Sequence, residues 1–228
     1  MSPMKSVVIC SAGVGSRLGL DKPKCLAEIE GRPLIHWQLD LLDDYENIVV
    51  VVGFRAADVM QTVRQKRTDA IFAVNHDYRT TNTLDSLIMG ASALDGPFIS
   101  LDGDLLVTES ALRAIEDAPC PAIGIKRTYS EEPVCVRLGE DVNRGLVLGF
   151  IREPLAYEWT GLAKLHPDHV KAAKGSQYVF HAVERLLPVP WVEIDCIEID
   201  TNQDMQEAKV WMRDQLTSGS FGRIAVSA

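Results

Sequence analysis

The apolar residues of this 228-residue chain fall into short continuous runs that alternate with segments of helical spacing. Continuous runs rich in β-branched residues are typical of parallel strands buried on both faces. Four strands are predicted in such runs, at 7–10, 48–53, 70–74 and 97–101. Helices are expected between and after them, at 33–44, 56–67, 84–91 and 109–117. This alternation predicts a doubly wound, mostly parallel (Rossmann-like) α/β sheet with right-handed crossovers.

The pattern changes near Cys120. Residues 120–165 contain several short apolar runs separated by turns and no long helical segment, so we expect an antiparallel section there. Such an insertion would cover the carboxyl ends of the parallel strands, where open α/β sheets bind ligands. A helix at 168–186, a strand at 192–199 and a helix at 201–216 are expected next. The organisation is therefore one domain, 1–216, with a loosely held Gly/Ser-rich tail at 217–228.

Composition excludes some classes of protein. The chain has 23 basic and 32 acidic residues, a net charge of -9, which disfavours binding to nucleic acid or to an anionic membrane. No apolar run of 18 residues and no leader-type segment occurs, so we expect a cytoplasmic protein. Five scattered cysteines without a C-x-x-C pair indicate neither a zinc site nor a disulfide framework. A homodimer is compatible with the sequence, which does not itself determine the oligomeric state.

Small residues follow the first predicted strand and form a candidate anion-binding loop. Its small members are Ser11, Ala12, Gly13, Gly15 and Ser16. Small residues let backbone N–H groups approach an anion closely, and Arg17 and Lys24 add positive charge. A dinucleotide-binding loop would need a third glycine at Leu18, and a Walker A loop would need Gly-Lys-Ser/Thr. A tight turn is the alternative, but the two cations favour a phosphate-binding loop.

Two carboxylates end the strand at 97–101, in the sequence Asp102-Gly103-Asp104. Glycine between two acids lets the backbone turn while both side chains face one crevice. Carboxylate oxygens are ligands that Mg²⁺ prefers, with phosphate and water completing its shell. The alternative is an Asp-Gly turn with solvated acids. A Glu-Ile-Asp sequence also occurs twice, at 193–195 and 198–200, and only the second copy precedes a helix start.

The loop pattern G-x-G-x-R followed by P-K, the strand-end G-D and the sequence E-I-D-T-x-x-D resemble nucleotidyltransferases that activate sugar phosphates and phosphocholine. The resemblance implies the nucleotide-diphospho-sugar transferase fold and a loop that wraps the triphosphate. It implies that Asp104 and Asp200 hold Mg²⁺, with Asp102 as a further candidate partner, and that Arg17 and Lys24 neutralise the phosphates. Gly103 and Asp102 then lie on the nucleotide side. The alternative role of Asp200 is a helix N-cap, although Thr201 can fill that role.

A narrower resemblance concerns the substrates. Asn75, Tyr78 and the run 81–87 resemble the N-x-x-Y…N-x-x-x-S-L segment of bacterial phosphocholine cytidylyltransferases. The resemblance implies nucleotide contacts, or alternatively a capped helix start, at four further residues: Thr80, Asn82, Thr83 and Ser86. Residues 152–155 and 158–164 resemble a block of phosphonate cytidylyltransferases, with Arg152 in place of a lysine. The acceptor-side residues so implied are Lys126, Arg127, Arg152, Glu158, Trp159, Lys164 and Trp191.

These acceptor-side residues leave the acceptor open. Trp159 beside Glu158 suits a cationic head such as choline, whereas Lys126, Arg127 and Arg152 suit additional negative charge. We expect a Mg²⁺-dependent cytidylyltransferase that transfers CMP from CTP to a small phosphate or phosphonate and releases pyrophosphate. No general base is needed, because such an acceptor is already ionised at neutral pH. The alternatives are a sugar-1-phosphate uridylyl- or thymidylyltransferase on the same fold, and a non-catalytic nucleotide-binding domain.

Overall fold

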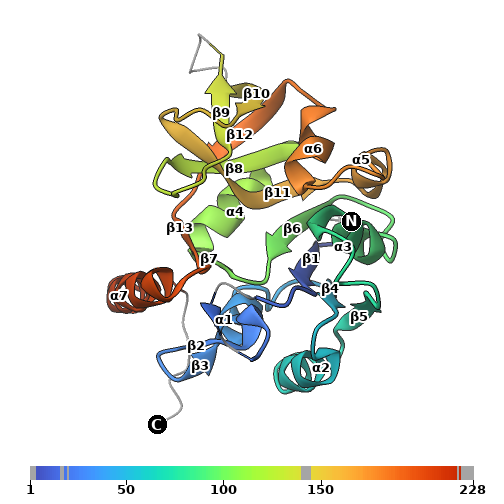
Figure 1. Ribbon diagram of the computed structural model, residues 1–228, viewed down its shortest axis with the longest axis vertical. Coiled ribbons are helices and arrows are strands. Elements are labelled where there is room, and N and C mark those ends of the chain that lie inside the picture. Colours follow the sequence, from blue (N-terminus) through green and yellow to red (C-terminus); the bar gives the residue numbers. More distant parts are fainter. Residues whose placement is uncertain (1–3, 16–17, 20, 140–144, 220, 222–228) are drawn as a thin grey trace.

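A nine-stranded sheet runs through the whole molecule (Figure 1). The computed structural model describes residues 4–15, 18–19, 21–139, 145–219 and 221. In spatial order, the strands of the sheet are β5 (Ile71–Val74), β4 (Asn47–Val52), β1 (Ser6–Ser11), β6 (Phe98–Asp102), β11 (Tyr157–Leu165), β8 (Ala122–Arg127), β12 (Val189–Glu193), β10 (Leu146–Ile151) and β9 (Cys135–Leu138).

The first four strands in that order are parallel, as the apolar runs predict. β1 lies at the centre of this half and pairs in parallel with both β4 and β6, and β4 pairs in parallel with β5. The register sets Cys10 opposite Asp102, so the strands that precede the glycine loop and the acidic turn end at one edge. The parallel half of the sheet therefore brings both sequence motifs together.

The antiparallel section is present, as predicted. Its strands continue the same sheet, because β11 pairs antiparallel with both β6 and β8. β12, β10 and β9 extend the sheet beyond β8. Two small two-stranded sheets lie apart from it: β2 (Glu28–Ile29) with β3 (Arg32–Pro33), and β7 (Leu105–Val107) with β13 (Cys196–Glu198).

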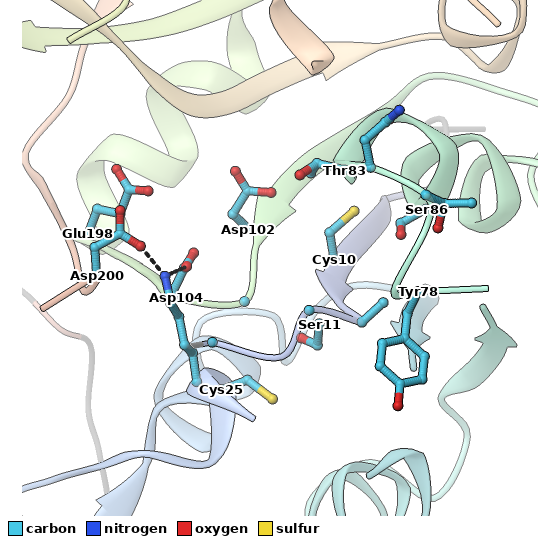
Figure 2. Close-up of a pocket in the computed structure, with 17 residues that line it drawn as sticks. Cys10, Ser11, Cys25, Tyr78, Thr83, Ser86, Asp102, Asp104, Glu198 and Asp200 are labelled. Carbon is cyan, nitrogen blue, oxygen red and sulfur yellow. Dashed lines mark hydrogen bonds and ion pairs between the residues drawn. The ribbon is translucent and has the colours of Figure 1, made fainter. Parts of the chain in front are cut away.

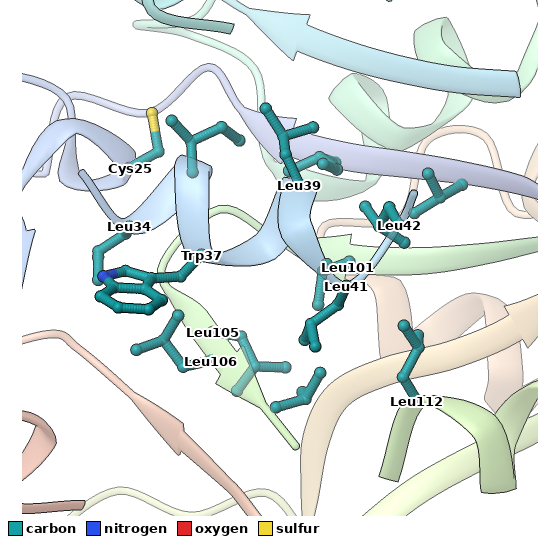
Figure 3. Packing of buried hydrophobic residues seen from close by; sticks show 14 of the residues in the cluster. Cys25, Leu34, Trp37, Leu39, Leu41, Leu42, Leu101, Leu105, Leu106 and Leu112 are labelled. Atoms are coloured by element: carbon teal, nitrogen blue, oxygen red, sulfur yellow. The ribbon is translucent and has the colours of Figure 1, made fainter. Parts of the chain in front are cut away.

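Helices cover both faces of the sheet. Four contribute to the apolar cluster on one face: α1 (Leu34–Asp40), α2 (Ala56–Arg64), α4 (Glu109–Asp117) and α7 (Asn202–Ser218). Three pack on the other: α3 (Thr83–Ala91), α5 (Pro167–Lys171) and α6 (Val179–Glu184). Close to the acidic turn, α1 packs its buried side chains against Leu101, Leu105 and Leu112, from β6, β7 and α4 (Figure 3).

Several predicted boundaries are wrong, each for a local reason. The helix expected at 33–44 ends at Asp40 and continues as tight turns. The helix expected at 168–186 is two short helices, separated by a turn in which Gly175 has φ +93°. The strand expected at 192–199 is broken after Glu193, because the Ile194 N–H still donates to the Ile125 carbonyl while β13 turns away to pair with β7.

The C-terminal boundary also differs. α7 extends to Ser218 and ends at Gly219, whose φ of +74° is the left-handed conformation that closes helices. Beyond it, Phe221 is only 1% exposed and meets the rings of Trp37 and Trp211 edge-on. The chain at these positions is therefore part of the packed domain, whereas a loose tail from residue 217 was expected.

Candidate nucleotide and metal site

Three carboxylates converge at the edge of the sheet. Asp104 lies in the turn between β6 and β7, Glu198 ends β13, and Asp200 precedes α7. One oxygen from each of the three lies within 4.8 Å of the others. The pairing of β13 with β7 sets Glu198 opposite Leu105, and the Ile199 N–H donates to the Asp104 carbonyl at 3.0 Å. Backbone pairing thus joins acids that are far apart in the sequence.

Lys24 inserts its ammonium between two of these acids. Its Nζ lies 2.8 Å from Asp104 Oδ2 and also donates to Asp200 Oδ1 (Figure 2). Burial alone would lower the pKa of Lys24, but the two carboxylates outweigh burial, and the net pKa is raised. The lysine of the predicted P-K pair therefore stays charged and links the loop to the carboxylates.

Glu198 is a site residue that the sequence analysis missed. Its side chain reaches solvent at the mouth of the site, yet desolvation and then the charges of Asp104 and Asp200 raise its pKa to about 7. Burial and then the same carboxylate cluster hold the pKa of Asp102 well above its usual range. The sequence did contain a signal for this residue, because Glu198 is the glutamate of the same Glu-Ile-Asp sequence that ends in Asp200.

A cleft of about 380 Å³ adjoins the cluster. The glycine loop contributes Ser11, Ala12, Gly13, Gly15 and Lys24 to its wall. Gly15 has φ +66°, and a Cβ there would come within 2.7 Å of Lys24 Cγ, so only glycine lets the lysine cross the loop. Ser16 and Arg17 lie outside the described residues, so the predicted contacts of Arg17 with phosphate stay predictions.

The start of α3 forms the opposite side of the cleft, where Thr83 points toward Asp102 and Ser86 lies farther from it (Figure 2). Asn82 caps the helix, and its side chain accepts a hydrogen bond from the Asp85 N–H. Buried Asn75 donates to the hydroxyls of Thr81 and Ser86 at 2.9 and 3.0 Å. This network fixes polar groups along the wall.

Of the nucleotide-side residues predicted near α3, Asn82, Thr83 and Ser86 line the cleft. Thr80 does not, because its hydroxyl donates to the Asp77 carbonyl on the exposed side of the turn. Thr81 and Tyr78 line the cleft instead, and so do Cys10 and Cys25. Burial raises the pKa of both thiols, that of Cys25 to about 12, so neither is a thiolate nucleophile at neutral pH.

The predicted acceptor-side residues divide between the two faces of the sheet. Tyr157 and Trp159 on β11, with Ile123 and Ile125 on β8, pack on the α3–α6 face. Because side chains alternate along a strand, Arg127 lies on that same face, and its guanidinium is 4.5 Å from the Tyr157 ring. Lys126 and its strand partner Glu158 lie on the opposite face, toward β13.

On the β13 face, Glu158 is a buried ionisable group, only 1% exposed. It accepts hydrogen bonds from the N–H groups of Tyr129 and Ser130 and from the Ser130 hydroxyl, and Lys126 Nζ lies 3.5 Å away. The Lys126 charge also acts to lower the pKa of Glu198. Burial and the neighbouring acids raise this pKa by more, so its net shift is upward. Among the predicted acceptor-side cations in the described part of the chain, Lys126 is therefore the one whose charge acts on a member of the carboxylate cluster.

The structure brings the remaining acceptor-side residues to other places. The Lys164 ammonium donates to the carbonyls of Glu116 and Ala118, where it caps the end of α4, so this lysine is engaged away from the cleft. Arg152 lies over the Phe180 ring at 5.6 Å, and Trp159 meets Phe150 edge-on. These contacts place Arg152 and Trp159 with the aromatic residues near α6.

The donor set of the carboxylate cluster fits a hard divalent cation. Its three groups offer only anionic oxygens, and the structure holds a cationic ammonium between two of them. Burial and then repulsion from Asp104 and Asp200 raise the pKa of Glu198, and a cation would relieve the repulsion. Asp102 lies beside the cluster in the cleft wall but outside the group of three.

With its polar cleft at the carboxyl edge of the parallel half of the sheet, this molecule is an open α/β domain of the class that binds ligands at that edge. The chain belongs to the MobA-like NTP transferase family, whose pattern it matches over residues 7–186. The predicted relationship to nucleotidyltransferases is thereby confirmed. Among the described residues, no helix is long and apolar enough to cross a membrane.

Solved structures of the same fold include the inositol-1-phosphate CTP transferase from T. maritima, with a TM-score of 0.79 and 18% identity. That match covers 95% of this chain and 97% of the other. The CTP:phosphocholine cytidylyltransferase from Streptococcus pneumoniae has a TM-score of 0.76 and 20% identity, over 92% of this chain and all of the other. These likenesses confirm the predicted fold.

Two curated relatives match the chain over about half of its length. The CMP-5'-(3-aminopropyl)phosphonate synthase of Streptomyces rubellomurinus is 32% identical over 124 residues, which are 51% of this chain and 20% of that protein. The bifunctional protein GlmU of Cutibacterium acnes is 30% identical over 118 residues, which are 50% of this chain and 28% of that protein. The matching stretch is therefore under a third of either relative.

Proposed function

We propose that this protein is a Mg²⁺-dependent nucleotidyltransferase that moves CMP from CTP to a small phosphate or phosphonate and releases pyrophosphate. The observation that carries the proposal is the carboxylate cluster of Asp104, Glu198 and Asp200, joined by Lys24 to a glycine loop beside one polar cleft. A loop and carboxylates so arranged suit a triphosphate at one end and a metal at the other. Family membership supports the reaction class.

In the proposed reaction an anionic oxygen of the acceptor attacks the α-phosphorus of the nucleotide. A new P–O bond forms, the bond to the β-phosphate oxygen breaks, and pyrophosphate leaves with the electron pair. When bound by Asp104 and Asp200, Mg²⁺ would screen the two anions and stabilise the developing charge. Lys24, which stays protonated, balances charge on the triphosphate and on pyrophosphate as it leaves.

The rest of the cleft supports binding and orientation of the nucleotide. Thr83, Asn82 and Ser86 offer polar groups on the side away from the carboxylates, suited to a ribose and base. Backbone N–H groups of the loop around Gly13 suit the phosphates. No general base is required, because phosphate and phosphonate acceptors are already ionised at neutral pH. The high thiol pKa of Cys25 argues against covalent catalysis by that residue.

The choice of CTP is supported by the named activities of similar proteins. Two structural neighbours are described as a CTP transferase and a cytidylyltransferase, and one relative as a CMP-phosphonate synthase. A structural neighbour described as a proposed glucose-1-phosphate thymidylyltransferase favours a second candidate, a sugar-1-phosphate uridylyl- or thymidylyltransferase. The cytoplasmic location and the homodimer stay predictions from the sequence.

Pyrophosphate release across CTP, UTP, dTTP and ATP separates these candidates. Each nucleotide is tested with phosphocholine, 2-aminoethylphosphonate and glucose 1-phosphate, with Mg²⁺ or with EDTA. We expect turnover with CTP and a phosphocholine- or phosphonate-type acceptor, and its loss in EDTA. Preference for UTP or dTTP with the sugar phosphate would overturn the cytidylyl assignment, and undiminished turnover in EDTA would overturn the metal assignment.

A further inference from the structure

Gln38 is a buried polar residue on an otherwise apolar helix face. It is 2% exposed, and its neighbours on α1 that point inward are leucine, isoleucine and tryptophan. A carboxamide at such a position loses its hydration on folding, which costs free energy unless hydrogen bonds replace the water. Two backbone contacts of this side chain indicate why a polar group is present there.

The Gln38 Nε2 donates to two carbonyl oxygens, those of Asp102 and Leu105, each at 2.7 Å. These two carbonyls flank the acidic turn that carries Asp104. Carbonyl oxygens only accept hydrogen bonds, so the nitrogen of the carboxamide, and not its oxygen, faces the turn. The Gln38 Oε1 is buried without a hydrogen-bond partner in the described part of the chain. Gln38 therefore binds both carbonyls while its own Oε1 stays without a hydrogen bond to any described residue.

Other backbone contacts fix the rest of this turn. The Gly103 N–H donates to the Cys10 carbonyl at 2.9 Å, which ties the turn to β1 and the glycine loop. The Asp104 carbonyl accepts from the Ile199 N–H, which ties it to the segment between Glu198 and Asp200. A Cβ at Gly103 would overlap the Ser11 hydroxyl, so the turn lies tightly against β1. Gln38 supplies the remaining attachment, from α1.

We propose that Gln38 is a positioning residue for the metal-binding carboxylate, acting through the backbone on both sides of Asp104. This inference rests on the proposed function, because it assumes that Asp104 is a metal ligand. Groups that orient metal ligands without touching the metal commonly change metal affinity or activity by about 10- to 100-fold when removed. Loss of both hydrogen bonds frees the turn to shift relative to Asp200 and Lys24.

The test uses Mn²⁺ alone as the probe, with free Mn²⁺ measured by electron paramagnetic resonance at pH 8. Gln38→Met keeps the length of the side chain and removes the donor, and Gln38→Leu removes the donor with a shorter apolar side chain. Trp37→Phe is the matched control, because Trp37 is also buried on α1 and its Nε1 donates to a carbonyl remote from the turn, that of Ile29. Asp104→Asn is the reference for loss of a ligand.

We expect Mn²⁺ to bind about tenfold more weakly to both Gln38 variants and within twofold of wild type to Trp37→Phe. Thermal melting and circular dichroism establish which variants are folded, and Gln38→Leu decides the matter if Gln38→Met is not. Wild-type Mn²⁺ affinity in a folded Gln38 variant, or equal weakening by Trp37→Phe, overturns the positioning role. Equal binding by wild type and Asp104→Asn overturns the metal assignment itself, so the two failures are distinguishable.

Discussion

Lys24 neutralises carboxylates that would otherwise repel one another, so its removal should cost stability as well as function. The perturbation is Lys24→Met, which keeps much of the side-chain volume and deletes the ammonium between Asp104 and Asp200. The two like charges then face each other across the cleft. The variant therefore tests whether Lys24 and a bound metal ion neutralise the same carboxylates.

The magnitude follows from burial. A charge pair at 2.8 Å has a gross attraction of about 6 kcal/mol at an effective dielectric constant of 20, most of which is offset by desolvation. Breaking a fully buried pair typically costs about 3–5 kcal/mol, and an exposed pair about 0–1 kcal/mol. Lys24 and its partners are 16–22% exposed, so we expect an intermediate loss of about 2 kcal/mol. For a domain of this size, that loss lowers the Tm by about 4–8 °C.

The assay is thermal melting at pH 8, in EDTA and in a Mg²⁺ series, with Lys22→Met as the matched control. Lys22 is on the same loop, but its pair with Glu28 spans 3.8 Å and is exposed, so little change is expected. A divalent cation can replace the lost charge, and a ligand at a hundred times its Kd adds about 2.7 kcal/mol. Mg²⁺ should therefore raise the Tm of Lys24→Met more than that of wild type. Equal melting of the two lysine variants in EDTA would refute the reasoning.

Three further outcomes are expected. Asp104→Asn should abolish pyrophosphate release with CTP while circular dichroism stays native, because the lost charge acts on the metal; retained turnover would contradict this. Glu198 has a pKa of about 7, above its usual value, so without Mg²⁺ its contribution to stability falls as the pH rises through that range. The Tm advantage of Glu198→Gln over wild type should therefore grow between pH 5 and 8, and a constant difference would count against it. Lys126→Met should raise the KM for the acceptor about tenfold with an unchanged KM for CTP, whereas Arg127→Met, on the opposite face, should change neither; equal effects would remove Lys126 from the acceptor side.

The local motifs were predictable because they depend on short spacings. A β-branched run followed by glycines indicates a strand and an anion loop, and an Asp-Gly-Asp end to a strand indicates oxygen ligands. Lys24 and Asp104 therefore followed from the sequence together with the family resemblance, and the structure brings them within 2.8 Å. Family membership and the fold are confirmed by the comparisons.

The missed features depend on contacts distant in sequence. Glu198 joins the cluster only because β13 pairs with β7, and Gln38 reaches the acidic turn only because α1 packs beside it. The sequence pattern does not show what the Lys164 ammonium contacts, and in the fold this ammonium caps the end of α4. Alternation along a strand is enough to put Lys126 and Arg127 on opposite faces of β8, but which face points toward β13 depends on the fold.

The pairing of β13 with β7 also has a consequence for the order in which the protein becomes functional during synthesis. The parallel strands and the glycine loop all precede Gly103, but Glu198 and Asp200 come much later in the chain. A ribosome adds about 5–20 residues each second, so the glycine loop and Asp104 emerge seconds before Glu198 and Asp200 do. A nascent chain stalled before β13 would hold the glycine loop without two of the three clustered acids. If these acids hold the metal as proposed, activity therefore begins only after β13 has emerged and paired with β7.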